Sequence, residues 1–347
     1  MSMIPRHKVT SVAIIGFAVI ALICAFLYTA GVFGNNQVTA QQFVNFQQGE
    51  NPHLGFRRAH AKGVCVRGDF IATGELAAHT RSTLFEAGST PFIGRFSIGG
   101  GNPSAPDLES GVRSLALSFD AGSDQQWRTA MNTPPVMAVG TPEDFYAQLQ
   151  TLMPDPETGQ RNPERIAEFF ANHPETENFR RWSAQYQPSG SFASEQYHSI
   201  NAFYLINQQG EQQAVRWAAV PTVQIDENQY ADTDQAANAL ALDVRDQLED
   251  GTIVFDLVFT LASSDDDENN PTQPWPESRQ QITAGQLVIR QLEQDAAICN
   301  NLNFDPLILP RGMQATNDPI LRARSASYAE SYRRRARETW LGKEQQQ

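Results

Sequence analysis

Eight short runs of alternating apolar and polar residues constrain the fold of this 347-residue chain more than any other feature. Successive side chains of a strand point to opposite faces, so each run predicts a β-strand with one buried face. Eight antiparallel strands are enough to close a barrel, and a β-sandwich fits the count almost as well. The runs cover residues 70–76, 92–98, 112–119, 134–139, 200–206, 214–220, 252–262 and 286–292.

Helical periodicity interrupts these strands in two places. Residues 142–152, 163–171 and 175–186 are predicted helices, with prolines and acidic residues near their starts, and a further helix covers 234–248. We therefore expect an α+β fold, in which an eight-stranded antiparallel β-barrel carries helical insertions and ends in a C-terminal helix. The composition suits one large domain, since 41% of the residues are hydrophobic and 19% are charged.

The N-terminal part contains an uncharged run of 23 residues, 11–33. As a helix it would be about 30 to 35 Å long, enough to cross a bilayer. Arg6 and Lys8 precede the run and the next fixed positive charge is Arg57, so we expect a cytoplasmic N-terminus and the remainder of the chain on the periplasmic or extracytoplasmic side. A cleaved signal peptide ending near Ala40 is the alternative.

These features predict an order of segments along the chain. The predicted segments are a cytoplasmic N-terminus (1–10), a transmembrane anchor (11–33), a polar tether (34–50), the main domain (51–337) and a polar tail (338–347). The net charge of -13 argues against a nucleic-acid partner. Cys65 and Cys299 would face an oxidising compartment, and the sequence leaves open whether they pair.

The segment RRAHAKGVCVRGDF holds the first candidate for a catalytic residue, His60. Its small neighbours and Gly63 let other groups approach the imidazole closely, although an ordinary surface histidine is the alternative. In GRFSIGGG, Arg95 and Ser97 lie two apart on a predicted strand and therefore on one face. An arginine that faces into a barrel needs an anion, whereas one that faces outward would be solvated.

Two further candidates follow along the chain. Asn132 precedes Thr133-Pro134, which read alone is a turn-forming sequence. Phe145 opens the helical section, where an aromatic residue of a helix core is the ordinary interpretation.

The C-terminal segment predicts a helix that begins after Asp318-Pro319 and runs to residue 337. Its residues Arg324, Tyr328 and Arg335 follow one another at helical spacing and share one face. A guanidinium one turn before Tyr328 would favour the phenolate, whose ordinary pKa of about 10 keeps it protonated at neutral pH. This arrangement suits an iron ligand, and a basic exposed helix with a partly buried tyrosine is the alternative.

Taken together, these motifs resemble those of the haem catalases. R-x-x-H-A-K-G, R-F-S and N-T-P resemble the distal side of the family's haem site, and F-D-P-x-x-L-P-x-G with R-x-x-x-Y resembles its proximal side. The resemblance implies haem b as the cofactor, His60 and Asn132 as the distal catalytic pair, and Tyr328 as the axial metal ligand. It further implies propionate binding by Arg57, Arg95 and Arg335, support of His60 by Ser97 and of Tyr328 by Arg324, and a place near the porphyrin for Phe145.

The chain also departs from a full catalase. It ends shortly after Arg335 with no C-terminal helical domain, has Val136-Met137 where Phe-Phe is usual, and has Ala329-Glu330 after the tyrosine. With the expected anchor, these features resemble the single-domain, membrane-anchored catalase-related peroxidases.

The activity expected from that resemblance is a peroxidase reaction. His60 would move a proton within bound hydrogen peroxide while Asn132 orients it, and a small organic reductant would then reduce an oxoferryl haem. Residual catalase activity and a homo-oligomeric state are both compatible with the resemblance. An enzyme for fatty hydroperoxides and a membrane-tethered haem- or lipophile-binding barrel without turnover are the alternatives. A serine hydrolase is disfavoured because the sequence has no G-x-S-x-G motif.

Overall fold

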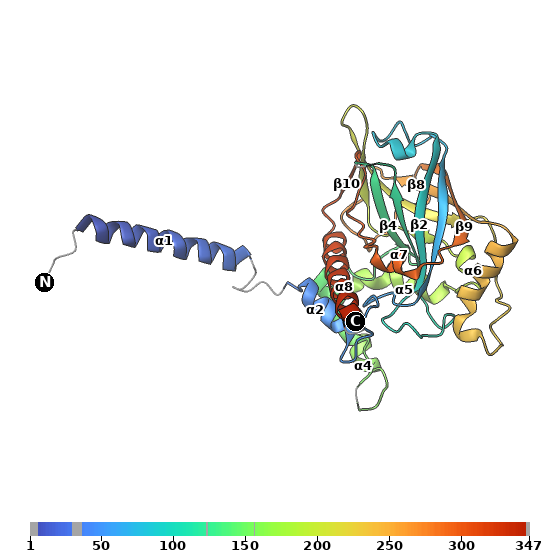
Figure 1. Ribbon diagram of the computed structural model, residues 1–347, viewed down its shortest axis with the longest axis horizontal. Helices are drawn as coiled ribbons and strands as arrows, with labels where there is room; N and C mark the ends of the chain where they lie inside the picture. Colours follow the sequence, from blue (N-terminus) through green and yellow to red (C-terminus); the bar gives the residue numbers. More distant parts are fainter. Residues whose placement is uncertain (1–5, 30–36, 123, 156, 345–347) are drawn as a thin grey trace. The chain divides into compact units, whose positions relative to one another are not determined.

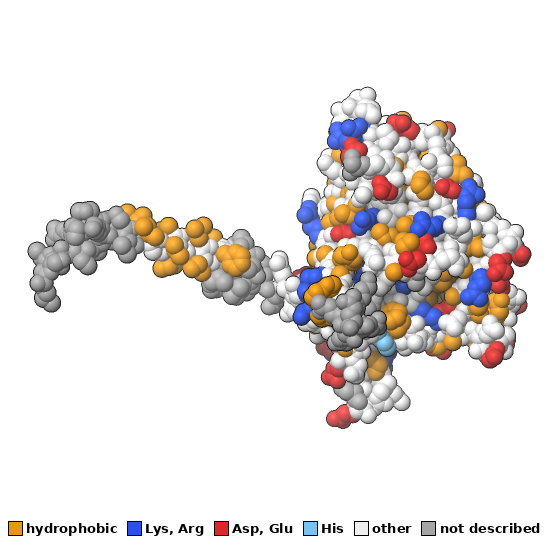
Figure 2. Space-filling model, viewed as in Figure 1, with side chains coloured by type: hydrophobic (Ala, Val, Ile, Leu, Met, Phe, Trp, Pro, Cys, Tyr) orange, Lys and Arg blue, Asp and Glu red, His pale blue; other side chains and the backbone are white. Residues whose placement is uncertain are grey.

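The computed structural model describes residues 6–29, 37–122, 124–155 and 157–344, and the chain divides into two units, Met1–Thr39 and Ala40–Gln347 (Figure 1). In the first unit, helix α1 covers Arg6–Thr29, and Figure 2 shows apolar side chains along it. Residues 30–33 of the predicted anchor lie outside the described residues. No helix in the described part of the chain is long and apolar enough to cross a membrane, so the predicted transmembrane helix is not supported.

The second unit is built on an antiparallel sheet that closes into a barrel (Figure 1). Pairing runs around the ring in the order β7, β5, β4, β3, β2, β1, β9, β8 and back to β7. This confirms the predicted eight-stranded antiparallel barrel. β6 pairs with β7 on the same edge as β5, and β10 extends β6. The strands are β1 (Gly63–Ala72), β2 (Gly88–Ile98), β3 (Arg113–Asp120), β4 (Gln126–Asn132), β5 (Tyr197–His198), β6 (Phe203–Ile206), β7 (Gln212–Pro221), β8 (Ile253–Leu261), β9 (Gln281–Leu292) and β10 (Met313–Ala315).

Three of the predicted strands differ from the structure. The run 70–76 overlaps only the end of β1, which begins at Gly63 and ends at Ala72. Residues 134–139 form bends and irregular structure, and the fourth strand is β4, which ends just before them. The reason is that Pro134 and Pro135 have no N–H to donate to a ladder. The run 200–206 is interrupted at its first residue, because Ile200 has a φ of 65° and therefore leaves the extended conformation between β5 and β6.

Helices cover the outside of the barrel (Figure 1). The α-helices of the second unit are α2 (Ala40–Gln48), α3 (Pro142–Thr151), α4 (Pro163–Asn172), α5 (Glu177–Gln185), α6 (Ala239–Asp250), α7 (Ala296–Asn301) and α8 (Pro319–Glu344). Short 3₁₀ turns are η1 (Thr83–Phe85), η2 (Pro174–Thr176), η3 (Phe192–Ser194) and η4 (Ala236–Asn238). The Thr141 and Asn162 side chains cap α3 and α4, each followed by a proline at the first helical position, as helix starts favour.

Both ends of the second unit are more ordered than the sequence suggested. The segment predicted as a tether contains α2, which packs against α8. α8 continues through the predicted polar tail to Glu344. The two ends of the domain therefore support each other.

The interior of the barrel is filled by aromatic side chains. Trp127 is fully buried and lies 4.9 Å from the ring of Phe119 and 5.5 Å from that of Phe85, measured between centroids. Phe96 on β2 belongs to the same core. Because successive residues of a strand face opposite sides, Arg95 and its alternating neighbours face the outside of the barrel, beneath the helices.

Candidate active site

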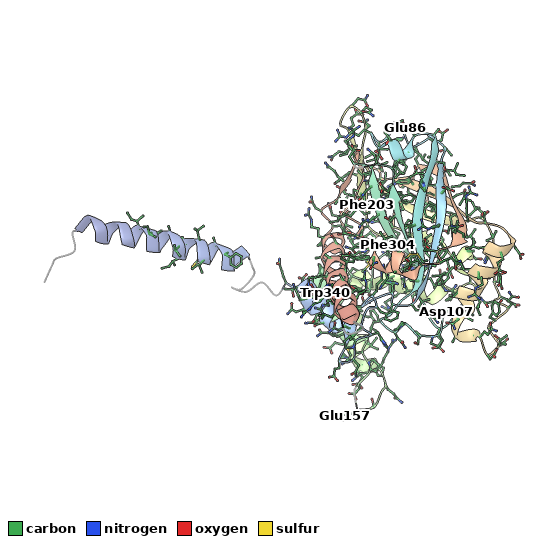
Figure 3. The ribbon with its side chains drawn as sticks, in the orientation of Figure 1. Glu86, Asp107, Glu157, Phe203, Phe304 and Trp340 are labelled. Carbon is green, nitrogen blue, oxygen red and sulfur yellow. A yellow bond between two sulfur atoms is a disulfide. The ribbon has the colours of Figure 1, made fainter. Side chains whose placement is uncertain are left out.

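The candidate residues come together outside the barrel, where the outer face of β2, β3 and β4 meets the segment 57–61 and helix α8. Arg95 is on this face but is only 7% exposed, so neither expectation for it, a place inside the barrel or a solvated side chain, was correct. The Arg57 guanidinium carbon lies 5.6 Å from the centroid of the Phe304 ring, which is labelled in Figure 3. The site is therefore built between the barrel wall and the C-terminal part of the chain.

His60 is held in a conformation that is unusual for a residue with a side chain. Its φ is 54°, in the left-handed region, which costs on the order of 1–3 kcal/mol and persists only where the surroundings enforce it. The Arg95 guanidinium enforces it by donating to His60 O at 2.9 Å and to Ala61 O at 3.0 Å. Gly63 permits this approach, since a Cβ there would lie 2.2 Å from Phe96 O and 2.8 Å from the Arg95 guanidinium carbon.

The His60 ring is bonded to a residue that the sequence did not indicate. Ser114 Oγ on β3 lies 3.2 Å from His60 Nδ1 and also donates to Asn132 Oδ1 at 2.5 Å. The expected partner was Ser97. Ser97 is buried on the same face of the neighbouring strand, opposite Ser114 in the register, and the described contacts include no bond from it to His60. The cross-strand register thus brings His60, Ser114 and Asn132 together.

Burial, and after it the neighbouring guanidiniums of Arg95, Arg324 and Arg57, together lower the pKa of His60 to about 4, against a smaller opposing effect of a backbone hydrogen bond to Ile98. The ring is therefore neutral at pH 7. A neutral imidazole has one nitrogen with a free lone pair, which is what a proton acceptor requires.

Three guanidiniums crowd around this site, and the one carboxylate that acts on them among the described residues, Glu338, only partly offsets the lowered pKa of Arg335. Burial lowers the pKa of Arg57 to about 9, of Arg95 to about 10 and of Arg335 to about 9, and the three repel one another pairwise: Arg57 with Arg95, Arg95 with Arg335, and Arg335 with Arg57. None of them forms an ion pair within the described parts of the chain, and Arg335 Nε is buried without any hydrogen-bond partner. Buried uncompensated cations are costly, so this place is suited to an anionic group.

Backbone carbonyl groups at the end of α7 hold two of these arginines. Arg57 Nη2 donates to Cys299 O at 2.7 Å and Leu302 O at 3.0 Å, and Arg335 Nη2 donates to Asn300 O at 3.2 Å. A disulfide joins Cys299 to Cys65 on β1, with 5.9 Å between the Cα atoms. The pairing that the sequence left open therefore anchors the segment on which the arginines depend.

Helix α8 contributes Tyr328, which is half-buried. Its electrostatic interaction with Arg57 and Arg95 raises their pKa values and so offsets part of the lowering by burial. Arg324 differs from expectation. Its Nη2 donates to Ala130 O at 2.7 Å and its Nη1 donates to Asn201 Oδ1, and no hydrogen bond from it to Tyr328 is found in the described residues. Arg324 thus joins α8 to the barrel wall instead of contacting the phenol.

Phe145 on α3 packs against Phe43 of α2, with 5.5 Å between ring centroids. Its expected place near a porphyrin stays a prediction.

A second contact, not foreseen from the sequence, fixes the segment before His60 to α8. Arg58 is 3% exposed and forms an ion pair with Glu338, whose other oxygen accepts from Gly55 N at 2.8 Å. Arg58 N also donates to Ser331 Oγ at 3.4 Å. These bonds join positions about as far apart as the chain of the domain allows, so no local pattern could have indicated them.

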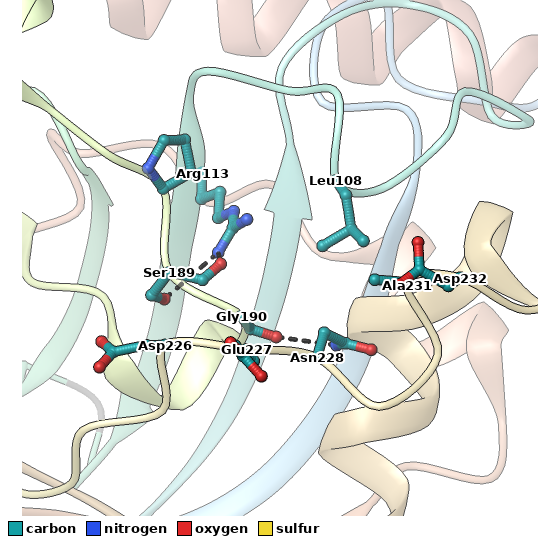
Figure 4. Close-up of a pocket in the computed structure, with 10 residues that line it drawn as sticks. Leu108, Arg113, Ser189, Gly190, Asp226, Glu227, Asn228, Ala231 and Asp232 are labelled. Atoms are coloured by element: carbon teal, nitrogen blue, oxygen red, sulfur yellow. Dashed lines mark hydrogen bonds between the residues drawn. The ribbon is translucent and has the colours of Figure 1, made fainter.

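A pocket of about 430 Å³ opens elsewhere, beside Arg113 (Figure 4). Arg113 Nη1 pairs with Glu195 at 2.8 Å and donates to Ser189 O at 2.7 Å, and Asn228 Nδ2 donates to Gly190 O at 2.7 Å. None of the candidate residues lines this pocket. The candidate residues thus gather around His60 and not at this pocket.

Comparison with known proteins decides the family. The family model described as catalase matches residues 32–341. The chain belongs to the catalase family. It is 37% identical over 310 residues to a catalase-related peroxidase of Synechococcus elongatus, covering 88% of this chain and 91% of that protein. It is 29% identical to a catalase-related peroxidase of Mycolicibacterium paratuberculosis over 81% of this chain and 89% of that protein.

Solved catalase structures share the fold. A fungal catalase superimposes with a TM-score of 0.73 at 20% identity over 81% of this chain, and a bacterial catalase with 0.72 at 21% over 88%. The chain spans only 59% and 62% of their respective lengths, whereas it spans nearly all of the two catalase-related peroxidases. It is a haem enzyme of the catalase or peroxidase type.

The residues of the site fit a haem. A haem carries two carboxylates, and the three buried guanidiniums of Arg57, Arg95 and Arg335 lack the anion that would compensate them. Tyr328 offers a phenol oxygen, a known type of axial ligand in this family, beside the same arginines.

Proposed function

We propose that this chain is a haem b peroxidase that reduces hydrogen peroxide with a small organic electron donor. The observation that carries the proposal is the cluster of three buried, unpaired guanidiniums beside a neutral His60. Such a cluster weakens the fold without a ligand and matches a dianionic planar cofactor. The similarity to catalase-related peroxidases over almost their whole length supports the same assignment.

The site residues would divide between binding and proton transfer. Arg57, Arg95 and Arg335 would bind the haem propionates, and Tyr328 would bind the iron. The haem, when bound, supplies the redox chemistry of O–O cleavage.

His60 carries out the acid–base part of the reaction. Its free ring nitrogen takes a proton from the near oxygen of hydrogen peroxide and returns it to the departing oxygen, which leaves as water. The lowered pKa of His60 keeps the ring available for this step at neutral pH. Asn132 donates from its amide nitrogen and orients the peroxide.

Two activities distinguish a peroxidase from a catalase, and both can be measured on one preparation. We expect rapid oxidation of a guaiacol-type donor by haem-loaded protein and slow release of oxygen from peroxide alone. Substitution His60→Ala should lower the rate of donor oxidation by at least about a hundredfold, the lower range for a lost general acid–base catalyst, while the haem spectrum is retained. Fast oxygen release without donor oxidation would contradict the proposal, as would an unchanged rate in His60→Ala.

We also propose that the catalytic domain works in an oxidising, extracytoplasmic compartment. The disulfide between Cys65 and Cys299 supports this, since structural disulfides persist in oxidising environments and are rare in the cytosol. Alkylating free thiols during cell lysis and identifying the labelled cysteines by mass spectrometry would test this proposal. Recovery of Cys65 and Cys299 as alkylated thiols from the native source would contradict it.

A further inference from the structure

The hydroxyl group of Ser114 joins the two groups that face the substrate in the proposed function. Its Oγ lies 3.2 Å from His60 Nδ1 and 2.5 Å from Asn132 Oδ1. Ser114 is 6% exposed and sits on β3, a strand of the barrel wall. Its position is therefore set by the sheet and not by the ligand.

The number of protons at this junction determines which atom donates to which. A serine hydroxyl has one proton, and the amide oxygen of Asn132 can only accept, so that proton points to Oδ1. Toward His60 the same Oγ must then accept, which requires the ring proton to be on Nδ1. Because the neutral ring has a single proton, Nε2 is left with its lone pair free.

The same bond also fixes the orientation of the Asn132 amide. With Oδ1 bound to Ser114, the amide nitrogen is the end that remains for a bound molecule. The Ser114 hydroxyl thus leaves one acceptor, His60 Nε2, and one donor, Asn132 Nδ2, which is the pair that peroxide needs for proton transfer and orientation.

The charges around the ring favour its neutral form. Arg95, Arg324 and Arg57 all disfavour a second proton on His60, so the neutral form prevails and its tautomer matters. Ser97, the other serine on this face, has no described bond to the ring, so it does not duplicate this role.

We propose that Ser114 is a positioning residue that selects the His60 tautomer with Nε2 unprotonated and turns the Asn132 amide nitrogen toward the substrate. This inference rests on the proposed function, because it assumes that His60 and Asn132 face the haem-bound substrate. It adds a residue from β3 to a site that sequence motifs alone assign to β2, β4 and the segment 57–61.

Two small ligands of ferric haem test the inference without relying on turnover. Hydrogen cyanide must give up its proton to a distal base as cyanide binds, whereas nitric oxide has no proton to transfer. The association rate of each is measured by stopped-flow absorbance on haem-loaded wild-type protein and on the variants Ser114→Ala, Ser114→Thr, Ser97→Ala and His60→Ala. Ser118→Ala, on the same face of β3, is the matched control.

We expect Ser114→Ala to keep its haem spectrum and its nitric oxide rate but to bind cyanide about 3- to 10-fold more slowly, the effect of one lost hydrogen bond. Ser114→Thr keeps a hydroxyl and should recover most of the rate, Ser118→Ala should match the wild type, and Ser97→Ala should slow cyanide binding less than Ser114→Ala does. An unchanged cyanide rate in Ser114→Ala, with a reduced one in His60→Ala, would overturn the role of Ser114 and leave the proposed function standing. An unchanged cyanide rate in both would overturn the proposed function itself.

Discussion

Replacement of Arg335 by methionine should have opposite effects on the stability of the haem-free protein and on its affinity for haem. Arg335 is 4% exposed and forms no ion pair in the described structure, and repulsion from Arg57 and Arg58 outweighs the attraction of Glu338. Methionine has a similar length and no charge. The substitution therefore removes a buried cation while largely filling its volume.

The expected magnitude follows from the interactions of Arg335. Burial is the main cause that lowers its pKa from the ordinary value of an arginine to about 9. At about 1.4 kcal/mol per pKa unit, holding this charge in the folded protein costs about 3 to 5 kcal/mol. Against this, methionine loses two long hydrogen bonds, to Asn300 O at 3.2 Å and Ser331 Oγ at 3.4 Å, and a contact 5.5 Å from the Tyr332 ring. Each is worth about 1 kcal/mol or less, so a net gain of about 1 to 2 kcal/mol in the free energy of unfolding remains.

Urea unfolding of haem-free protein measures the first effect and haem titration the second. Arg337→Met, an exposed position on the same helix, is the control and should change the free energy of unfolding by less than about 0.5 kcal/mol. Loss of one charge-assisted bond to a propionate should weaken haem binding about 10- to 100-fold in Arg335→Met. The reasoning is refuted if Arg335→Met is less stable than the wild type and binds haem equally well, because the guanidinium would then be a structural residue.

Three further predictions concern the connections of the site. Reducing the disulfide between Cys65 and Cys299 removes a cross-link that restricts the unfolded chain, so the free energy of unfolding should fall by about 2 to 5 kcal/mol and the affinity for haem should fall with it. Equal stability with and without dithiothreitol would contradict this. Because protonation removes the lone pair of His60 and its pKa is lowered to about 4, the rate of reaction with peroxide should stay constant from neutral pH down to about 5 and decline toward pH 4; a decline centred near 6.5 would show that the ring is not shielded. Glu338→Gln leaves the buried Arg58 without its carboxylate and should cost about 3 kcal/mol in urea unfolding, whereas a loss below about 1 kcal/mol would show that the pair is solvated.

Local patterns were sufficient to predict most of the barrel. Alternation of apolar residues indicates one buried face, and this held for strands such as β8, whose residues alternate between buried and half-buried along Ile253–Leu261. It failed at 134–139, where two prolines remove ladder donors from an apolar run. It also could not show α2, since the Gln-rich segment 40–48 gains its helix by packing against α8.

The site was predictable where one residue type occurs in a short motif, and not where two distant segments meet. His60, Asn132 and Tyr328 were identified by motifs, and the structure places them around one cluster of charges. Ser114 was not, because the choice between it and Ser97 depends on strand register, which no spacing within one strand reveals. The hydrogen bonds of Arg324 could not be predicted for a similar reason, since their acceptors, Ala130 O and Asn201 Oδ1, belong to distant segments of the chain.

The absorption spectrum of the protein expressed with haem supply, beside that of the Tyr328→Phe variant, tests the central claim most directly. We predict a high-spin ferric haem spectrum in the wild type that is lost or clearly altered in Tyr328→Phe, because the variant lacks the phenol oxygen that would bind the iron. Arg337→Met should show the wild-type spectrum. An identical haem spectrum in wild type and Tyr328→Phe would contradict the proximal assignment, and no haem in either, while a control haem protein loads, would contradict the haem site as a whole.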